Sequence, residues 1–104
     1  MSDRIAEFEE KVRRNPKDTL ARFVLAKDLF EAGQASAAAG HFAELTRQKA
    51  DWMKAWILLG QAQTALGQLA EARAALEEAL RLARAQRHQG PEAEIQDLLA
   101  QLAG

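Results

Sequence analysis

Apolar residues recur along the chain at intervals of three and four positions. Near the N-terminus, Ile5, Phe8 and Val12 form one such stripe, and charged residues occupy the positions between them. This spacing matches the 3.6-residue turn of an α-helix, whereas no segment alternates with the two-residue period of a strand over the length of a strand. The pattern therefore predicts an all-α protein.

Helix-breaking residues divide the chain into segments. Asn15-Pro16, Gly33, Gly67 and Gly90-Pro91 fall between the apolar stretches. A glycine just past a helix takes the left-handed conformation that ends it, and the residue before a proline is driven out of the helical region. These breakers predict six helices, near residues 3–14, 18–32, 35–48, 52–66, 69–88 and 91–103.

Individual residues sharpen some of these boundaries. Asp18 and Asp51 stand where a side-chain oxygen can cap the second and fourth helices. The fifth segment has neither proline nor glycine before Gly90, so we expect this helix to continue to about His88.

Matching positions recur 34 residues apart. The second unit contains Trp56-x₂-Leu59-Gly60, then Ala72-x₃-Leu76, then Ala79. The first unit repeats the pattern in weaker form, as Arg22-x₂-Leu25-Ala26 followed by Ala38-x₃-Phe42. A helix–turn–helix unit with this period and these residues resembles the tetratricopeptide repeat (TPR) family.

The resemblance implies a right-handed superhelical stack of antiparallel helix hairpins, six helices in one domain over residues 1–104. It divides the chain into an N-terminal capping helix (3–14), repeat 1 (19–52), repeat 2 with an extended second helix (53–88) and a C-terminal capping helix (91–103). The alternative is a small bundle of two unrelated helix pairs. A whole set of small and large positions shared at one offset disfavours that bundle.

The small residues of the repeat have a physical role. Ala26 and Gly60 lie on the first helix of each unit, and Ala38 and Ala72 on the second. Small side chains on facing helices let the two axes approach closely, so that larger neighbours interdigitate.

In the family, the first helices of successive hairpins line a concave groove that holds a peptide or a helix. Carried over by position, the groove comprises Leu20, Phe23, Val24, Lys27, Phe30, Lys54, Ile57, Leu58, Gln61 and Thr64. Some family members hold a C-terminal carboxylate with a polar clamp. Phe23 and Leu58 stand where two of those polar residues belong, so the resemblance does not support a clamp here.

The chain offers no evident catalytic or metal-binding set. It has no cysteine, and its two histidines lie in different units. His41 with Glu44 is the one pair at helical ligand spacing, and we interpret both histidines as solvated surface residues. We therefore expect no enzymatic activity, no cofactor, no metal and no small-molecule substrate.

Charge argues against nucleic acid as the main partner. The 104 residues carry 14 Lys and Arg against 15 Asp and Glu, a net charge of −1. A stripe of Arg81, Arg84 and Arg87 leaves nucleic-acid contact as a remote alternative. The charged N-terminal residues and the absence of a long apolar run favour a cytoplasmic protein without a membrane segment.

Segment 18–32 is apolar on nearly all sides, which predicts burial on more than one face. Phe23 and Phe30 are left over once the internal core is assigned, and an exposed apolar patch of this kind is typical of an interface. The leading hypothesis is a non-catalytic module that binds another protein through this patch. The alternatives are a homodimer that buries the same patch, or a terminal helix that covers it. Trp52 has no family role and either fills a gap or anchors a partner.

Overall fold

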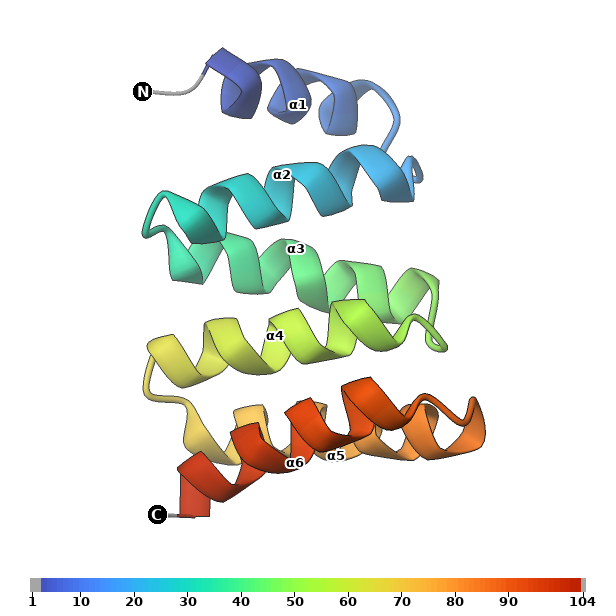
Figure 1. Ribbon diagram of the computed structural model, residues 1–104. Helices are drawn as coiled ribbons and strands as arrows, with labels where there is room; N and C mark the ends of the chain where they lie inside the picture. Colours follow the sequence, from blue (N-terminus) through green and yellow to red (C-terminus); the bar gives the residue numbers. More distant parts are fainter. Residues whose placement is uncertain (1–2, 104) are drawn as a thin grey trace.

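The structure, a computed structural model, describes residues 3–103, which form six α-helices and no strand. The elements are α1 (Asp3–Arg14), α2 (Thr19–Glu31), α3 (Ala35–Gln48), α4 (Met53–Ala65), α5 (Leu69–Ala85) and α6 (Gln89–Ala103). Figure 1 shows them stacked in chain order, each running antiparallel to the one before, with α6 folded back alongside α5. The predicted all-α stack of helix hairpins is confirmed. Within the described residues, no helix combines the length and apolarity needed to cross a membrane.

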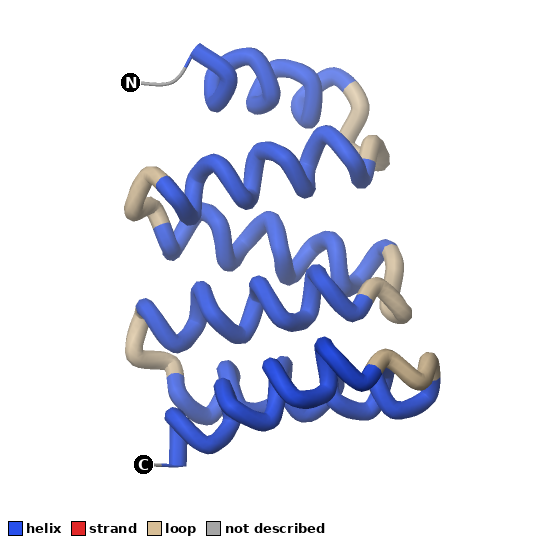
Figure 2. The backbone as a smooth tube through the Cα atoms, in the orientation of Figure 1, coloured by secondary structure: helices blue, strands red, loops and turns tan. Residues whose placement is uncertain are grey.

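The turns alternate between the two edges of the stack (Figure 2). At one edge, Gly33 and Gly67 have φ angles of +83° and +76°, a region that a residue with a Cβ atom enters only at a cost. Around Gly33, the Gln34 N–H donates to Leu29 O at 2.9 Å and the Gly33 N–H to Phe30 O at 3.0 Å. The same pair of bonds recurs around Gly67. These are Schellman motifs, so the two glycines end their helices as predicted.

The fifth helix is shorter than predicted. It ends at Ala85 rather than near His88, because Arg87 takes a φ of +60°. The His88 N–H then donates to Ala83 O at 2.9 Å, which closes a third Schellman motif with arginine in the place of glycine. The break could not be predicted from the residue type, since arginine is a good helix former.

One of the two predicted N-caps is present. The Asp18 side chain accepts a hydrogen bond from the Ala21 N–H at 3.0 Å and caps α2. The prediction for Asp51 was wrong, because α4 begins one residue later and its N-cap residue is Trp52, which makes no capping bond through its side chain. Asp51 lies exposed in the turn before it.

The core depends on small residues where helices meet. Ala26, Ala38 and Ala72 are fully buried, as predicted for close helix contacts. A Cβ atom built on Gly60 would lie 2.7 Å from Leu76 Cγ, nearer than side-chain atoms come to one another. Leu25 and Phe42 fill the space beside these contacts in the first hairpin.

A second buried cluster joins the last three helices. Ile57 of α4 packs with Leu76 of α5 and Ile95 of α6. Trp56 touches both this cluster and the larger one that runs from α1 to α5. The apolar stripe of α6 therefore packs inward, on the hairpin of α4 and α5, and not on the leftover residues of α2.

Candidate functional site

The ten residues predicted to form one groove have different surroundings. Leu20 is 71% exposed, and the side chains of Lys27 and Lys54 are exposed as well. Ile57 and Leu58 are only 1% and 8% exposed. These two support the α4 surface from beneath and are not accessible to a partner, because Ile57 is covered by α6 and Leu58 belongs to the larger core cluster.

The accessible part of this surface centres on an aromatic pair, Phe23 of α2 and Trp52 at the start of α4. Their rings are stacked, with centroids 4.8 Å apart and planes 23° apart. Phe23 also meets the buried Phe42 edge-on at 6.2 Å. Both members of the pair are half-buried. The stack joins the N-terminal halves of α2 and α4, and it gives Trp52 a packing partner that the sequence did not reveal.

Two lysines lie against the aromatic pair. Lys27 Nζ is 6.0 Å from the centroid of Phe23, and Lys49 Nζ is 5.1 Å from that of Trp52. Ammonium groups at these distances are attracted to the ring faces. We call these four residues, Phe23, Trp52, Lys27 and Lys49, the aromatic–lysine cluster.

A small hollow of 220 Å³ separates α1 from the N-terminal part of this surface. Phe23, Val24 and Lys27 line it together with an ion pair that crosses from helix to helix. Arg4 donates two hydrogen bonds, each 2.6 Å long, to the two carboxylate oxygens of Asp28. Asp28 is 9% exposed, and the Arg4 guanidinium holds the pKa of this carboxyl below its usual range.

Phe30 does not belong to the same depression as Phe23. It lines a hollow of 750 Å³ at the edge where the chain turns from α2 to α3 and from α4 to α5. Gly33 and Leu66 lie in this hollow, and none of its lining residues is charged. The two phenylalanines that the sequence grouped together therefore lie on separate parts of the surface.

Gln61 and Thr64 lie in a third hollow, of 420 Å³, between α4, α5 and α6. Leu76, Leu98 and Leu102 supply its apolar walls. The C-terminal helix thus narrows the second half of the predicted groove and leaves the first half open.

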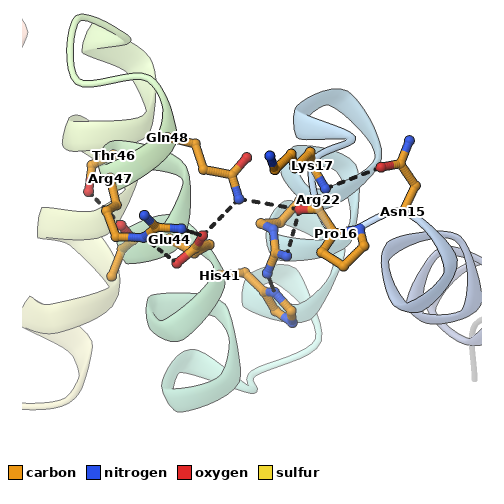
Figure 3. Close-up of polar contacts among 10 residues, drawn as sticks. Asn15, Pro16, Lys17, Arg22, His41, Glu44, Thr46, Arg47 and Gln48 are labelled. Atoms are coloured by element: carbon orange, nitrogen blue, oxygen red, sulfur yellow. Dashed lines mark hydrogen bonds and ion pairs between the residues drawn. The ribbon is translucent and has the colours of Figure 1, made fainter.

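His41 is not the solvated residue that was predicted. It is half-buried, and its Nδ1 lies 3.0 Å from Arg22 NH1 (Figure 3). Because a guanidinium can only donate, Nδ1 accepts, and the ring is neutral with its proton on Nε2. Burial lowers the pKa of His41, and the charge of Arg22 lowers it further.

Further hydrogen bonds close to His41 connect the turn after α1 to α3. Arg22 NH2 donates to the Pro16 carbonyl at 3.0 Å, and Gln48 Nε2 donates to the same oxygen at 3.2 Å. Glu44 accepts from Arg47 and Gln48, and these bonds lower its pKa to about 2. Glu44 is therefore engaged away from His41. Within residues 3–103, no group of three or more acidic or histidine side chains is placed to hold a metal ion.

The arginine stripe of α5 is partly neutralised. Arg81 Nε lies 3.1 Å from a carboxylate oxygen of Glu78, and Arg84 Nε lies 3.1 Å from one of Glu92 in α6. These pairings weaken the positive potential that the stripe would present to a phosphate backbone.

Trp52, for which the sequence left open whether it fills a gap or anchors a partner, was not among the ten predicted groove residues, and neither was Lys49. Their signal was the repeat itself: Trp52 stands 34 residues after Asp18, so each begins the first helix of its hairpin. Those two helices run in the same direction in the stack (Figure 1), and the stacked rings show that the start of α4 lies close to the first turns of α2.

Comparison with known proteins adds an independent line of evidence. The sequence model of the family described as anaphase-promoting complex, cyclosome, subunit 3 matches residues 3–79. A TPR repeat-containing protein of Pseudomonas aeruginosa is 37% identical over 73 residues, 70% of each chain.

Solved structures show the same arrangement of helices. A protein from Bordetella parapertussis is 29% identical, covers 99% of this chain and 90% of its own, and superposes with a TM-score of 0.82. The TPR2B domain of yeast Sti1, solved in a complex with pHsp70, superposes with a TM-score of 0.85 over 95% of this chain and 79% of its own. That domain is 19% identical, a likeness of fold alone.

Proposed function

Because the chain belongs to the tetratricopeptide repeat family, we propose that it is a non-catalytic module that binds a peptide or helix of another protein. The binding surface is the open part of the α2–α4 face: Leu20, Phe23 and Lys27 of α2, with Trp52 and Lys54 at the start of α4. In this proposal the α2–α3 and α4–α5 hairpins are the two repeats, and α1 and α6 cap the stack.

The observation that carries the proposal is the exposure of apolar side chains on α2. Leu20 is 71% exposed one helical turn before the half-buried Phe23, which stacks on Trp52. A soluble partner that buries such side chains gains about 25 cal/mol per Å² of apolar area. The yeast Sti1 domain, in its complex with pHsp70, is a precedent for a ligand on this fold.

The test uses a library of random 12-residue peptides displayed on phage and selected on the immobilised protein. We expect enriched peptides whose affinity, measured by fluorescence anisotropy, falls at least tenfold in Leu20→Glu. Leu69→Glu is the matched control, because Leu69 is a 50% exposed leucine at the start of α5. Equal weakening by both variants, or by neither, would contradict the assignment of this face.

A second copy of the chain is the alternative occupant. Sedimentation equilibrium of the protein alone separates the two cases. The proposal expects a monomer across the concentrations used for peptide binding, whereas a dimer that Leu20→Glu dissociates would show that the face serves self-association.

A further inference from the structure

Two lysine side chains beside the aromatic pair take no part in the ion pairs of this protein. Among the described residues, arginine takes part in six of the seven ion pairs and lysine in one, between Lys11 and Glu7. Lys27 and Lys49 have no carboxylate within ion-pair distance in this part of the chain. Glu31, one helical turn after Lys27, makes no pair with it either. Glu31 and the ion pair of Arg4 with Asp28 line the same hollow as Lys27, so charges of both signs surround the aromatic pair, and the two ammonium groups are the ones left without an ion pair.

These two lysines are held in place without being neutralised. Each ammonium lies against one ring of a stacked pair, so that Lys27, Phe23, Trp52 and Lys49 are in contact in succession. Contact with a ring orients the stem of a lysine while its charged end stays in water. Both lysines are exposed and both rings are partly exposed, so a ligand can reach charge and apolar area together.

We propose that the segment bound at the aromatic–lysine cluster is an acidic one, in which aspartate or glutamate side chains flank a large apolar residue. The apolar residue lies against Phe23 and Trp52, and the carboxylates pair with Lys27 and Lys49. This inference rests on the proposed function and specifies the chemistry of its partner.

Charge complementarity favours an acidic segment over a basic one at this cluster. A basic segment meets two unpaired ammonium groups and is repelled, whereas an acidic segment supplies carboxylates that can pair with them. A nucleic acid also carries negative charge, but its binding depends on many phosphate contacts, and this cluster offers two cations on a chain of net negative charge.

The test examines the composition of the peptides selected from the random library. We expect peptides enriched on the wild-type protein to carry a clear net negative charge and at least one aromatic or large aliphatic residue. Their affinity falls as salt is raised from 50 to 500 mM, since exposed charge pairs are screened. A 20-nucleotide single-stranded DNA does not displace them.

Substitution of the lysines locates the effect. Lys27→Gln and Lys49→Gln each weaken an acidic peptide by about threefold to fivefold, the scale of one exposed charge pair. Both side chains are exposed, so neither change disturbs the core. Lys17→Gln is the matched control, because it removes the same charge from a residue that lines a different hollow.

The outcomes separate the two proposals. If the selected peptides are neutral or basic but are still lost in Leu20→Glu, the inference about charge is overturned and the proposed function stands. If the wild-type protein enriches no peptide, both are overturned. Displacement by the DNA that Lys27→Gln and Lys49→Gln abolish would assign the cluster to nucleic acid instead.

Discussion

Gly60 is the residue on which the packing of the second hairpin most directly depends. Its missing side chain lets α4 approach α5 until Leu76 Cγ and Cδ2 occupy the space of a Cβ atom, at 2.7 and 2.8 Å from its ideal position. Both atoms belong to a leucine that is 1% exposed, and this side chain would have to shift to admit a Cβ atom. The family pattern marks this position as small, and the structure supplies the reason.

We predict that Gly60→Ala lowers the free energy of unfolding by about 1–2 kcal/mol, because the cost of overpacking exceeds the gain in helix propensity. Chemical denaturation followed by circular dichroism measures the change. Gly40→Ala is the control, since nothing lies within 4 Å of a Cβ atom at that position of α3. It should raise stability by about 0.5–1 kcal/mol. A stabilised Gly60→Ala would show that the two helices do not meet as described.

Arg87 carries a backbone conformation that suits glycine. At φ +60° it ends α5 as Gly33 and Gly67 end α2 and α4. We predict that Arg87→Gly raises the free energy of unfolding by about 0.5–1 kcal/mol, since it removes the steric cost of the left-handed region. Gly67→Ala should have the opposite sign in the same thermal or denaturant melt. No gain in Arg87→Gly would mean that α5 continues past Ala85 in solution.

Some residue contacts of this protein could be predicted from its sequence, and others could not. Repeat spacing was sufficient to predict Gly33, Gly67 and the buried alanines, because these depend on contacts that every hairpin of the pattern makes. The stack of Phe23 on Trp52 and the pairing of Arg22 with His41 join different helices. Such contacts depend on the relative positions of neighbouring helices, and the one-dimensional pattern does not give those positions.

At the scale of elements, few contacts hold α1 against the rest of the stack. Its inward stripe of Ile5, Phe8 and Val12 packs on the first hairpin, and the pair Arg4–Asp28 joins its first turn to α2. Most of the rest of its surface is charged, which suits a helix whose main neighbour is α2. The same pair forms one wall of the hollow next to Phe23, so the position of α1 affects the shape of the proposed binding face.

We predict that Asp28→Asn loosens α1 preferentially. The amides of α1 should exchange with solvent about fivefold to tenfold faster at neutral pH, because Arg4 loses its charged acceptor. Amide exchange read by NMR or mass spectrometry makes the comparison, with the amides of α5 as the internal control. Equal acceleration in α5 would contradict a local role for the pair.

The effect depends on pH with a definite sign. The pKa of Asp28 is lowered in the folded protein, so its contribution to stability is present above its unfolded pKa of about 3.9 and is lost as pH falls through the lower folded value. The difference between wild type and Asp28→Asn should therefore be constant near pH 7 and shrink below about pH 4. A difference that grows on acidification would exclude the ion pair as its source.

The C-terminal helix was predicted as a cap, and the structure shows what its apolar stripe touches. Ile95 packs beside Ile57 and Leu76, so α6 narrows the second half of the predicted groove. The sequence could identify the stripe, but it could not tell which face the helix would cover, because either end of the groove offered apolar partners. The open half is left to α2 and the start of α4.

For the whole molecule, the distribution of charge matters more than its sum. Arginines are bound to glutamates along α1, α3 and α5, while lysines near the α2–α4 face remain unpaired. A chain that is almost neutral therefore presents exposed ammonium groups without ion pairs beside a partly exposed aromatic pair. The central claim is that this surface, and not the hollows elsewhere on the stack, receives a partner.

The most direct measurement of that claim uses the two tryptophan side chains as reporters. Trp52 belongs to the aromatic–lysine cluster, whereas the indole N–H of Trp56 donates to Ala50 O at 2.9 Å and its ring lines a separate hollow with Leu59 and Gln63. A peptide selected on the wild-type protein is titrated into the ¹⁵N-labelled protein, and the two indole signals are followed by NMR. We expect the Trp52 signal to shift in proportion to binding and the Trp56 signal to keep its position. A shift of Trp56 with Trp52 unchanged would contradict it.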